Sequence, residues 1–293
     1  MDQVLRDEIV GRLAATEGMV LGEYAAAIVR FSQVIGSATA AVGTKILALG
    51  NLAVALNETG RLSRAEEAAR RALDLCNIDS EDAQPVLYHN LEAVLAAVRG
   101  AQNRSAEGLQ LVEASARDSL RHAAILDSAV NMVYGATMRR AAGDVEQARD
   151  EAETAVEMLG SLQAPLFLWM AEAELAGCEF AAGERVMARA RADRLTQALE
   201  SRGITLYAIR PRLVLAAAAL PGAPHEAVKV LAAYREQILS GNANWVLAMY
   251  MRAFPGLLGV VASVVGAECV PAHVLRMLPS ATIRAGWRKQ KAC

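Results

Sequence analysis

The amino-acid sequence predicts an all-α fold: an α-α superhelix (solenoid) of about six antiparallel helix hairpins, followed by a C-terminal capping segment of helices. Two observations concern composition. The 293 residues are 54% hydrophobic but only 4% aromatic, and alanine is abundant among them. Alanine, leucine, glutamate and arginine favour helices, whereas strands favour aromatic and β-branched residues. The third observation is a set of glycines that recur at a nearly constant interval.

These glycines mark the expected turns of the hairpins. They are separated by 38, 40, 43, 40 and 39 residues, and they are Gly22, Gly60, Gly100, Gly143, Gly183 and Gly222. Stacked supersecondary units produce a fixed period on this scale. Each glycine follows an apolar helical stretch, and glycine readily takes the left-handed conformation that ends a helix. The sequence therefore predicts a repeat region over residues 1–240.

A small residue stands five positions after each of these glycines. The residues are Ala27, Ala65, Ser105, Ala148, Ala188 and Ala227. A small side chain one turn into the second helix lets the two helix backbones approach closely. The clearest unit covers residues 46–77, where apolar side chains at helical spacing precede Gly60 and alanines at helical spacing follow it.

The chain changes character after residue 240. Residues 245–253 are expected to form a helix that stops at Phe254-Pro255, because the residue before a proline disfavours helical geometry. Two short apolar helices are expected at 257–265 and 271–278. Residues 241–280 are interpreted as a cap on the last repeat, with a homodimer or docking surface through 257–265 as the alternative. Residues 281–293 are expected to be a basic flexible tail, with contact to an acidic partner as the alternative.

The repeat residues resemble those of a known family. Leu52-Ala53, Leu56, Gly60, Leu62, Ala65, Ala69 and Ala72 are similar to a tetratricopeptide repeat, and Ala136, Gly143-Asp144, Ala148, Ala152 and Ala155 are similar to a second copy. The resemblance covers roughly residues 8–240, with a period of about 40 residues rather than about 34. Alanine-rich, degenerate repeats of this length are most similar to the repeat region of bacterial large ATP-binding transcriptional regulators. The resemblance implies a sensor or scaffold part without the nucleotide-binding and DNA-binding parts of such regulators.

Composition and charge exclude several classes of function. The formal net charge is −2, so no overall basic field favours direct nucleic-acid binding. No apolar run reaches the roughly 18 residues of a membrane span, and the charged N-terminus does not read as a secretory signal. The four cysteines lie far apart without metal-ligand or disulfide spacing. We interpret them as small buried residues and expect a cytoplasmic location.

Catalytic chemistry is not visible in the sequence. The four histidines fall in different repeats without a partner at helical spacing, and Glu172 and Glu174 are two residues apart, so they face different directions on a helix. We therefore expect no catalytic residue, no metal and no cofactor, and predict that the chain is not an enzyme.

The predicted function is that of a protein- or peptide-binding scaffold. A solenoid binds partners on its concave surface, which the exposed faces of the first helices line. The polar residues expected on that face are Asn51, Asn57, Asn90, Tyr134, Arg140, Glu174 and Arg212. The resemblance places Asn51 where peptide-binding tetratricopeptide proteins hold a ligand backbone, although Leu47 and Gly50 stand where a carboxylate clamp needs cations. Asn51 and Asn90 could equally bridge helices within the chain.

Two other functions remain as alternatives. One is a small-molecule sensor with a pocket between repeats, which requires an enclosed apolar site. The other is an enzyme on a helical scaffold, which requires titratable residues that the fold brings together.

Overall fold

The structure is a computed structural model that describes residues 2–19, 21–78 and 85–290. Its described residues are α-helical apart from turns and one short 3-10 helix, and they contain no strand. The chain divides into two compact units, Met1–Asn131 and Met132–Cys293, here called the N-terminal unit and the C-terminal unit. The predicted fold class, an all-α repeat of antiparallel hairpins, is confirmed.

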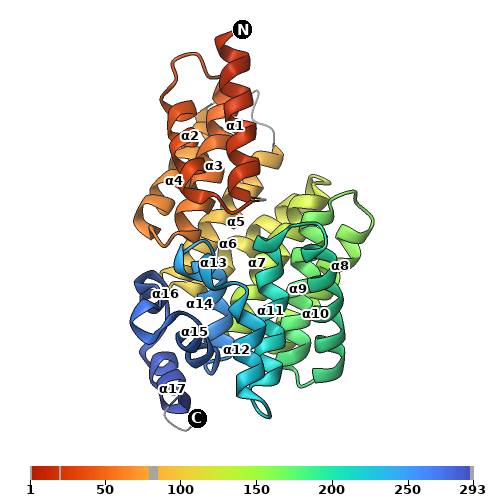
Figure 1. Cartoon of the computed structure of the whole chain (residues 1–293). Helices are drawn as coiled ribbons and strands as arrows, with labels where there is room; N and C mark the ends of the chain where they lie inside the picture. The colour runs from red at the N-terminus through yellow and green to blue at the C-terminus, as the bar shows by residue number, and fades with distance from the viewer. Residues whose placement is uncertain (1, 20, 79–84, 291–293) are drawn as a thin grey trace. The chain divides into compact units, whose positions relative to one another are not determined.

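The N-terminal unit contains three hairpins and the start of a fourth (Figure 1). Its helices are α1 (Gln3–Met19), α2 (Tyr24–Gly36), α3 (Val42–Glu58), α4 (Leu62–Ile78), α5 (Pro85–Ala101), α6 (Ser105–Arg121) and α7 (Ile125–Ala142), the last of which continues into the C-terminal unit. Each second helix packs on its own first helix, and α2 and α4 also pack on the first helix of the next hairpin. The first helices α1, α3 and α5 also contact one another in succession.

The C-terminal unit continues the repeat and then departs from it. Its repeat helices are α8 (Val145–Gly160), α9 (Pro165–Ala181), α10 (Arg185–Glu200), α11 (Thr205–Ala219) and α12 (Pro224–Ala232). The remaining helices are α13 (Arg235–Leu239), α14 (Asn244–Ala253), α15 (Leu257–Val265), the 3-10 helix Ala267–Cys269, α16 (Ala272–Met277) and α17 (Ser280–Gln290).

Left-handed turns close the hairpins, mostly as expected. Gly22, Gly60, Gly143 and Gly183 have φ between 74° and 93°. The turn predicted at Gly100 is displaced, because Gly100 lies inside α5 and the left-handed residue is Asn103, at φ 64°. An asparagine tolerates this conformation because its side chain can hydrogen-bond locally. Gly222 lies in the turn before α12 without a left-handed φ.

Small residues pack where the hairpins are closest. Ala27, Ala65, Ala148, Ala188 and Ala227 each have no exposed area. In the third hairpin, the buried residue five positions after the true turn at Asn103 is Gly108 rather than the predicted Ser105. The second helices then keep alanine at helical spacing, as Ala148, Ala152 and Ala155 do on α8. The alanine excess of the sequence is therefore a packing requirement of close helix pairs.

The segment after residue 240 is helical, and its role as a cap on the last repeat stays a prediction. The predicted helix boundaries agree with α14, α15 and α16. Most apolar residues of α15 are buried, and this helix contacts α12 and α17 of the same chain. A homodimer through this segment stays a prediction. The expectation of a flexible tail is corrected over residues 281–290, which belong to α17. Residues 291–293 lie outside the described part.

Candidate functional site

The first helices of both units carry one equivalent position. Asn51, Tyr134 and Glu174 each stand nine residues before a turn glycine, on α3, α7 and α9. Asn57 and Arg140 stand three residues before a turn glycine, on α3 and α7. Because the repeats share one geometry, these positions project from corresponding faces of their helices.

In the C-terminal unit, α14 covers this face. The rings of Tyr134 and Trp245 lie 5.5 Å apart between centroids, and the hydroxyl of Tyr250 donates a hydrogen bond of 3.3 Å to the carbonyl of Ala173. Residues 244–251 of α14 are all buried. These contacts place α14 against two first helices of this unit, α7 and α9.

Arg140 and Glu174 form a fully buried ion pair beneath α14. The Nε of Arg140 donates to Oε1 of Glu174 at 2.5 Å, and Nη2 donates to Oε2 at 3.2 Å. Neither side chain has exposed area. The guanidinium also lies over the ring of Tyr250, 4.2 Å from its centroid. The expectation that Arg140 and Glu174 face an open groove is corrected, because a buried charge persists only when paired.

Burial and the Arg140–Glu174 pair together shift the pKa values of the groups around them. Burial lowers the pKa of Arg140, but the Glu174 carboxylate outweighs this effect and raises it, so the guanidinium stays charged. Burial, followed by the Glu174 charge, raises the pKa of the Tyr250 hydroxyl and of the Cys178 thiol. Both groups are therefore protonated near neutral pH. Cys178 is not an activated thiolate, since reactive cysteines need a lowered pKa.

In the N-terminal unit, the equivalent face of α3 is more open. Leu47 is 50% exposed, and Asn51 and Val54, at helical spacing from it, are partly exposed. Asn57 is buried, and its Oδ1 accepts no hydrogen bond from the described residues. Asn90 lies in α5, but its side chain falls outside the described part.

Arg212 belongs to a different contact. It donates to Glu200 at 2.8 and 2.9 Å, and the hydroxyl of Tyr234 donates to the same carboxylate at 2.7 Å. This cluster joins α10, α11 and the turn between α12 and α13. Burial and the Glu200 carboxylate raise the pKa of Tyr234. Arg212 is thus held within the chain, and the structure does not bring the seven predicted residues into one site.

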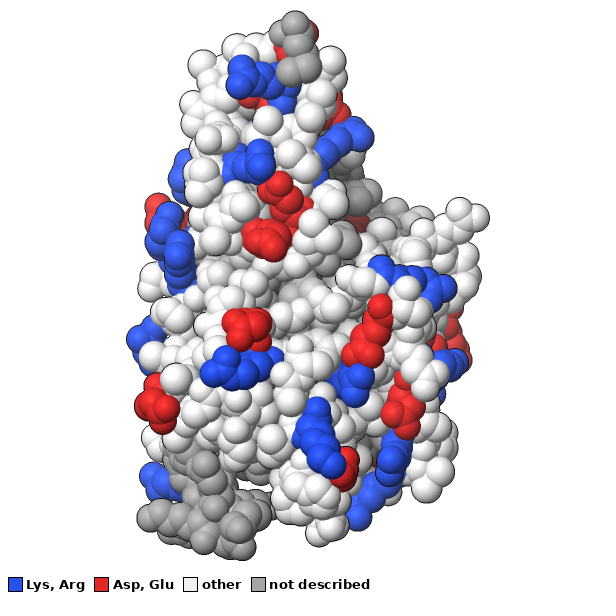
Figure 2. All heavy atoms as spheres, in the orientation of Figure 1, with Lys and Arg blue, Asp and Glu red and all other residues white. Residues whose placement is uncertain are grey.

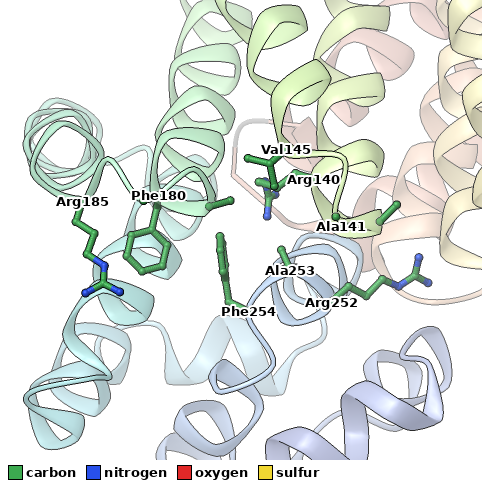
Figure 3. Close-up of a pocket in the computed structure, with 12 residues that line it drawn as sticks. Arg140, Ala141, Val145, Phe180, Arg185, Arg252, Ala253 and Phe254 are labelled. Atoms are coloured by element: carbon green, nitrogen blue, oxygen red, sulfur yellow. The ribbon is translucent and has the colours of Figure 1, made fainter.

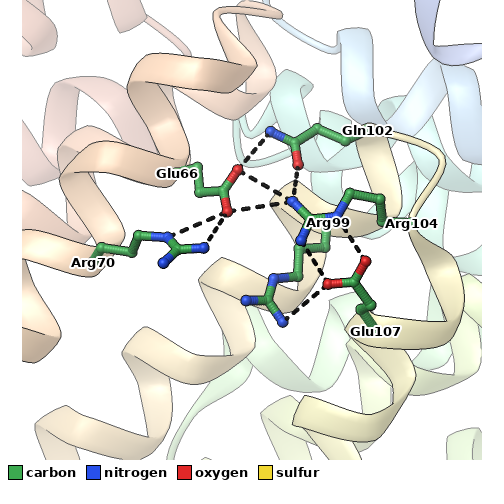
Figure 4. Close-up of polar contacts among 6 residues, drawn as sticks. All are labelled: Glu66, Arg70, Arg99, Gln102, Arg104 and Glu107. Carbon is green, nitrogen blue, oxygen red and sulfur yellow. Dashed lines mark hydrogen bonds and ion pairs between the residues drawn. The ribbon is translucent and has the colours of Figure 1, made fainter.

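A polar network also ties the hairpins of the N-terminal unit (Figure 4). Glu66 on α4 accepts hydrogen bonds from Arg70 at 2.8 Å and from Gln102 at 3.0 Å. Arg104, at the start of α6, lies 3.4 Å from Glu66 and 2.5 Å from Glu107. Burial raises the pKa of Glu66, but the hydrogen bonds of Arg70 and Gln102 outweigh it and lower the pKa to about 2. The network is structural, because each carboxylate is already matched by arginine.

A pocket of about 450 Å³ lies in the C-terminal unit, where the α7–α8 turn, the α9–α10 turn and the end of α14 meet (Figure 3). Its walls include Arg140 of α7 and Gly143 of the first turn, Phe180 of α9 and Arg185 of α10, and Phe254 directly after α14. The volume lies within the range of small-molecule sites. Sequence analysis missed this pocket because α14 completes it from a distant part of the chain.

Metal-ligating clusters and membrane-spanning helices are absent from the described residues. These residues contain no group of three His, Cys, Asp or Glu side chains able to hold a metal ion. No described helix is long and apolar enough to cross a membrane. Cys76 and Cys178 are buried as expected, but Cys269 is exposed. On the face in Figure 2, blue and red side chains are interspersed rather than gathered by sign.

Comparison with solved structures supports the fold. The chain shares its fold with a Rap protein. That protein was solved in complex with competence and sporulation factor, and it matches with a TM-score of 0.67 and 14% sequence identity, over 99% of this chain and 76% of the other. No family profile and no curated protein matches the sequence. The likeness supports a tetratricopeptide-like helical repeat and extends to fold alone.

Proposed function

We propose that this chain is a non-catalytic scaffold that binds a protein or peptide partner through the first helices of its N-terminal unit. The observation that carries the proposal is a difference between the two units in the exposure of one face of their first helices. In the C-terminal unit that face holds an apolar helix, α14, with Trp245 against Tyr134. In the N-terminal unit, the same face of α3 presents Leu47, half exposed, beside Asn51.

The chemistry of the partner follows from α14. A face that accepts an aromatic, apolar helix in one repeat suits an amphipathic helix or extended segment with an apolar anchor in another. Leu47 supplies apolar area, and the Asn51 amide supplies hydrogen bonds for a partner backbone. The Rap protein is described with a bound factor, which supports partner binding by this fold. We further propose a regulatory role, which rests on the resemblance to the repeat region of large transcriptional regulators.

Matched variants test this proposal. The intact chain captures partners from a cell lysate, and affinity is then measured with the purified partner by calorimetry. Leu47→Asp and Asn51→Ala are expected to weaken binding at least tenfold, roughly 1.4 kcal/mol. The control is Leu120→Asp on the second helix α6, because Leu120 is 49% exposed and Leu47 is 50% exposed. Unchanged binding by Leu47→Asp, or equal loss with Leu120→Asp, would overturn the proposal.

A second candidate function is a small-molecule sensor, and the pocket beside Arg140 favours it. A ligand that binds only the folded chain raises its thermal stability. In a sensor, the same ligand also changes the affinity for the partner, because binding at two sites is reciprocally coupled. Calorimetry with the partner, in the presence and absence of ligand, measures this coupling. Equal affinities under both conditions would remove the sensor function.

A further inference from the structure

Arginine is the only charged residue type among the residues that line the pocket of the C-terminal unit. Three arginines line it, Arg140, Arg185 and Arg252, and no Asp or Glu is among its lining residues. Arg185 is exposed and makes no ion pair with any described residue. Arg252 donates to the carbonyl of Met277 at 3.0 Å, and burial lowers its pKa to about 10.

Glu174 neutralises Arg140, but the acidic residues nearest to the pocket walls in the sequence, Asp144 and Glu184, are directed elsewhere. Asp144, beside Gly143, lies 3.7 Å from Nη1 of Arg139, and Glu184, beside Arg185, is ion-paired with Arg149. Each of these carboxylates is therefore directed to an arginine outside the pocket walls.

Arg140 brings an unused donor to the pocket. Glu174 binds Nε and Nη2 of its guanidinium, while Nη1 is buried and has no hydrogen-bond partner among the described residues. Figure 3 shows the Arg140 nitrogens directed towards the space beside Phe254. A buried, unsatisfied donor is costly, so an acceptor placed there by a ligand recovers a charge-assisted hydrogen bond.

Two helices begin at the pocket and add to its positive potential. Val145 and Arg185, the first residues of α8 and α10, both line it. The preceding residues, Asp144 and Glu184, make no side-chain capping hydrogen bond. The first backbone N–H groups of a helix have no partner within the helix, and this end carries partial positive charge.

The apolar part of the pocket lining comes mainly from two aromatic rings. Phe180 and Phe254 line the pocket with ring centroids 5.2 Å apart in an edge-on arrangement, and they stand side by side at its centre in Figure 3. Alanines line much of the rest. One end of the pocket therefore suits an anion and its middle suits an apolar body.

We propose that this pocket binds a small organic oxyanion, a carboxylate or phosphate joined to an apolar ring or chain. The oxyanion accepts a hydrogen bond from Nη1 of Arg140, the apolar part packs on Phe180 and Phe254, and Arg185 attracts the anion at the pocket. This inference names the class of ligand that the proposed sensor would bind. Only the biological role of the site rests on the proposed sensor function.

Simple probes distinguish the parts of this ligand. Phenylacetate and phenyl phosphate carry both features, phenylacetamide lacks the charge, and inorganic phosphate lacks the ring. Calorimetry and ligand-dependent thermal shifts with the intact chain are expected to show binding of one or both ring-bearing anions. The affinities for the neutral amide and for inorganic phosphate are expected to be lower by about tenfold or more. The stronger of phenylacetate and phenyl phosphate identifies the acid group.

Three variants and one control locate the binding. Arg140→Lys keeps the positive charge that pairs with Glu174 but removes Nη1. It is expected to lower the affinity for the tighter-binding probe about tenfold or more. Phe180→Ala and Arg185→Gln are expected to weaken it severalfold, and they keep the test valid if Arg140→Lys does not fold. The control is Arg189→Gln, one turn along α10 from Arg185, where the side chain is 73% exposed.

Any of three outcomes would overturn the inference. It fails if neither ring-bearing anion binds, if the neutral amide binds equally well, or if Arg189→Gln weakens binding as much as Arg185→Gln does. Partner affinity is measured separately. Probe binding without any effect on the partner removes the sensor function and leaves the oxyanion site, whereas partner binding without probe binding removes only the oxyanion site.

Discussion

The two compact units use the same repeat geometry, but they differ at the face of their first helices. In the C-terminal unit, α14 lies against α7 and α9, and the polar residues beneath it form the closed Arg140–Glu174 pair. In the N-terminal unit, Leu47 on α3 is half exposed, and the arginine–glutamate contacts around Glu66 lie partly in solvent. The difference shows that the corresponding face of the first helices is buried where α14 covers it and is more exposed on α3.

The largest expected effect comes from separating the buried pair. Arg140→Met or Glu174→Met alone is expected to lower the free energy of unfolding by roughly 3–5 kcal/mol, because each leaves an uncompensated buried charge. The double variant is expected to recover most of this loss. Urea unfolding of the two single variants and the double variant measures it. Arg212→Met, at a partly exposed pair with Glu200, is the control and is expected to cost under about 1 kcal/mol.

The next effect tests whether α14 is an integral part of its unit. Trp245 is 1% exposed, so Trp245→Ala is expected to destabilise by about 3 kcal/mol or more through lost burial and a cavity. Leu47→Ala, on the open face of α3, is expected to change stability by less than about 0.5 kcal/mol. Thermal unfolding compares the two variants. Similar small effects at both positions would show that α14 does not fill its face as the structure describes.

The turns give a smaller effect. Gly143→Ala is expected to cost about 1–2 kcal/mol, because φ is 93° and an L-residue is strained in that region. No atom lies within 4 Å of the added Cβ, so the cost is in the backbone rather than in a clash. Gly160→Ala in α8 also meets no atom within 4 Å and lacks the left-handed φ, so it is the matched control. Chemical unfolding is expected to show that the control is neutral or slightly stabilising.

The smallest effect is a pH dependence in the N-terminal unit. The pKa of Glu66 falls from an ordinary 4.5 to about 2 in the folded chain. The ionised carboxylate therefore stabilises the fold above the unfolded pKa, and this contribution disappears as the pH falls from about 4.5 towards 2. Glu66→Gln is expected to cost under about 1 kcal/mol at pH 7, since its arginine partners are partly exposed, and nothing at pH 2.

Unfolding series at pH 7, 4 and 3 compare this variant with Glu67→Gln. Glu67 is the exposed neighbour and makes no ion pair with any described residue. A pH-independent difference between wild type and Glu66→Gln would contradict the prediction.

Much of the fold was predictable because it is local. The turn glycines at 22, 60, 143 and 183, and the buried alanines five positions later, depend on backbone freedom and close helix contact within a single hairpin. The boundaries of α14 and α15 followed from Phe254-Pro255 and an apolar run. The misplaced turn at Gly100 has a local cause too, because Asn103 can replace glycine in a left-handed turn.

The candidate site was predictable only in part. The repeat offset selected Asn51, Tyr134 and Glu174 as equivalent, but it did not show which of them would be covered. One available signal was the segment 244–251, which is apolar on all sides and so requires burial on all sides. The Arg140–Glu174 pair had no such signal, because 34 residues separate its members.

The sequence by itself determined the helices, their pairing into hairpins and the small residues that let them pack, since these depend on interactions within about 40 residues. The tertiary structure decided what each first-helix face meets. Only the folded chain brings Tyr250 of α14, and Phe254 directly after this helix, over Arg140. This contact helps to bury the Arg140–Glu174 pair beside the pocket. Long-range packing determines which side chains are buried. Burial in turn determines whether an arginine must pair with a carboxylate within the fold or stays exposed to solvent.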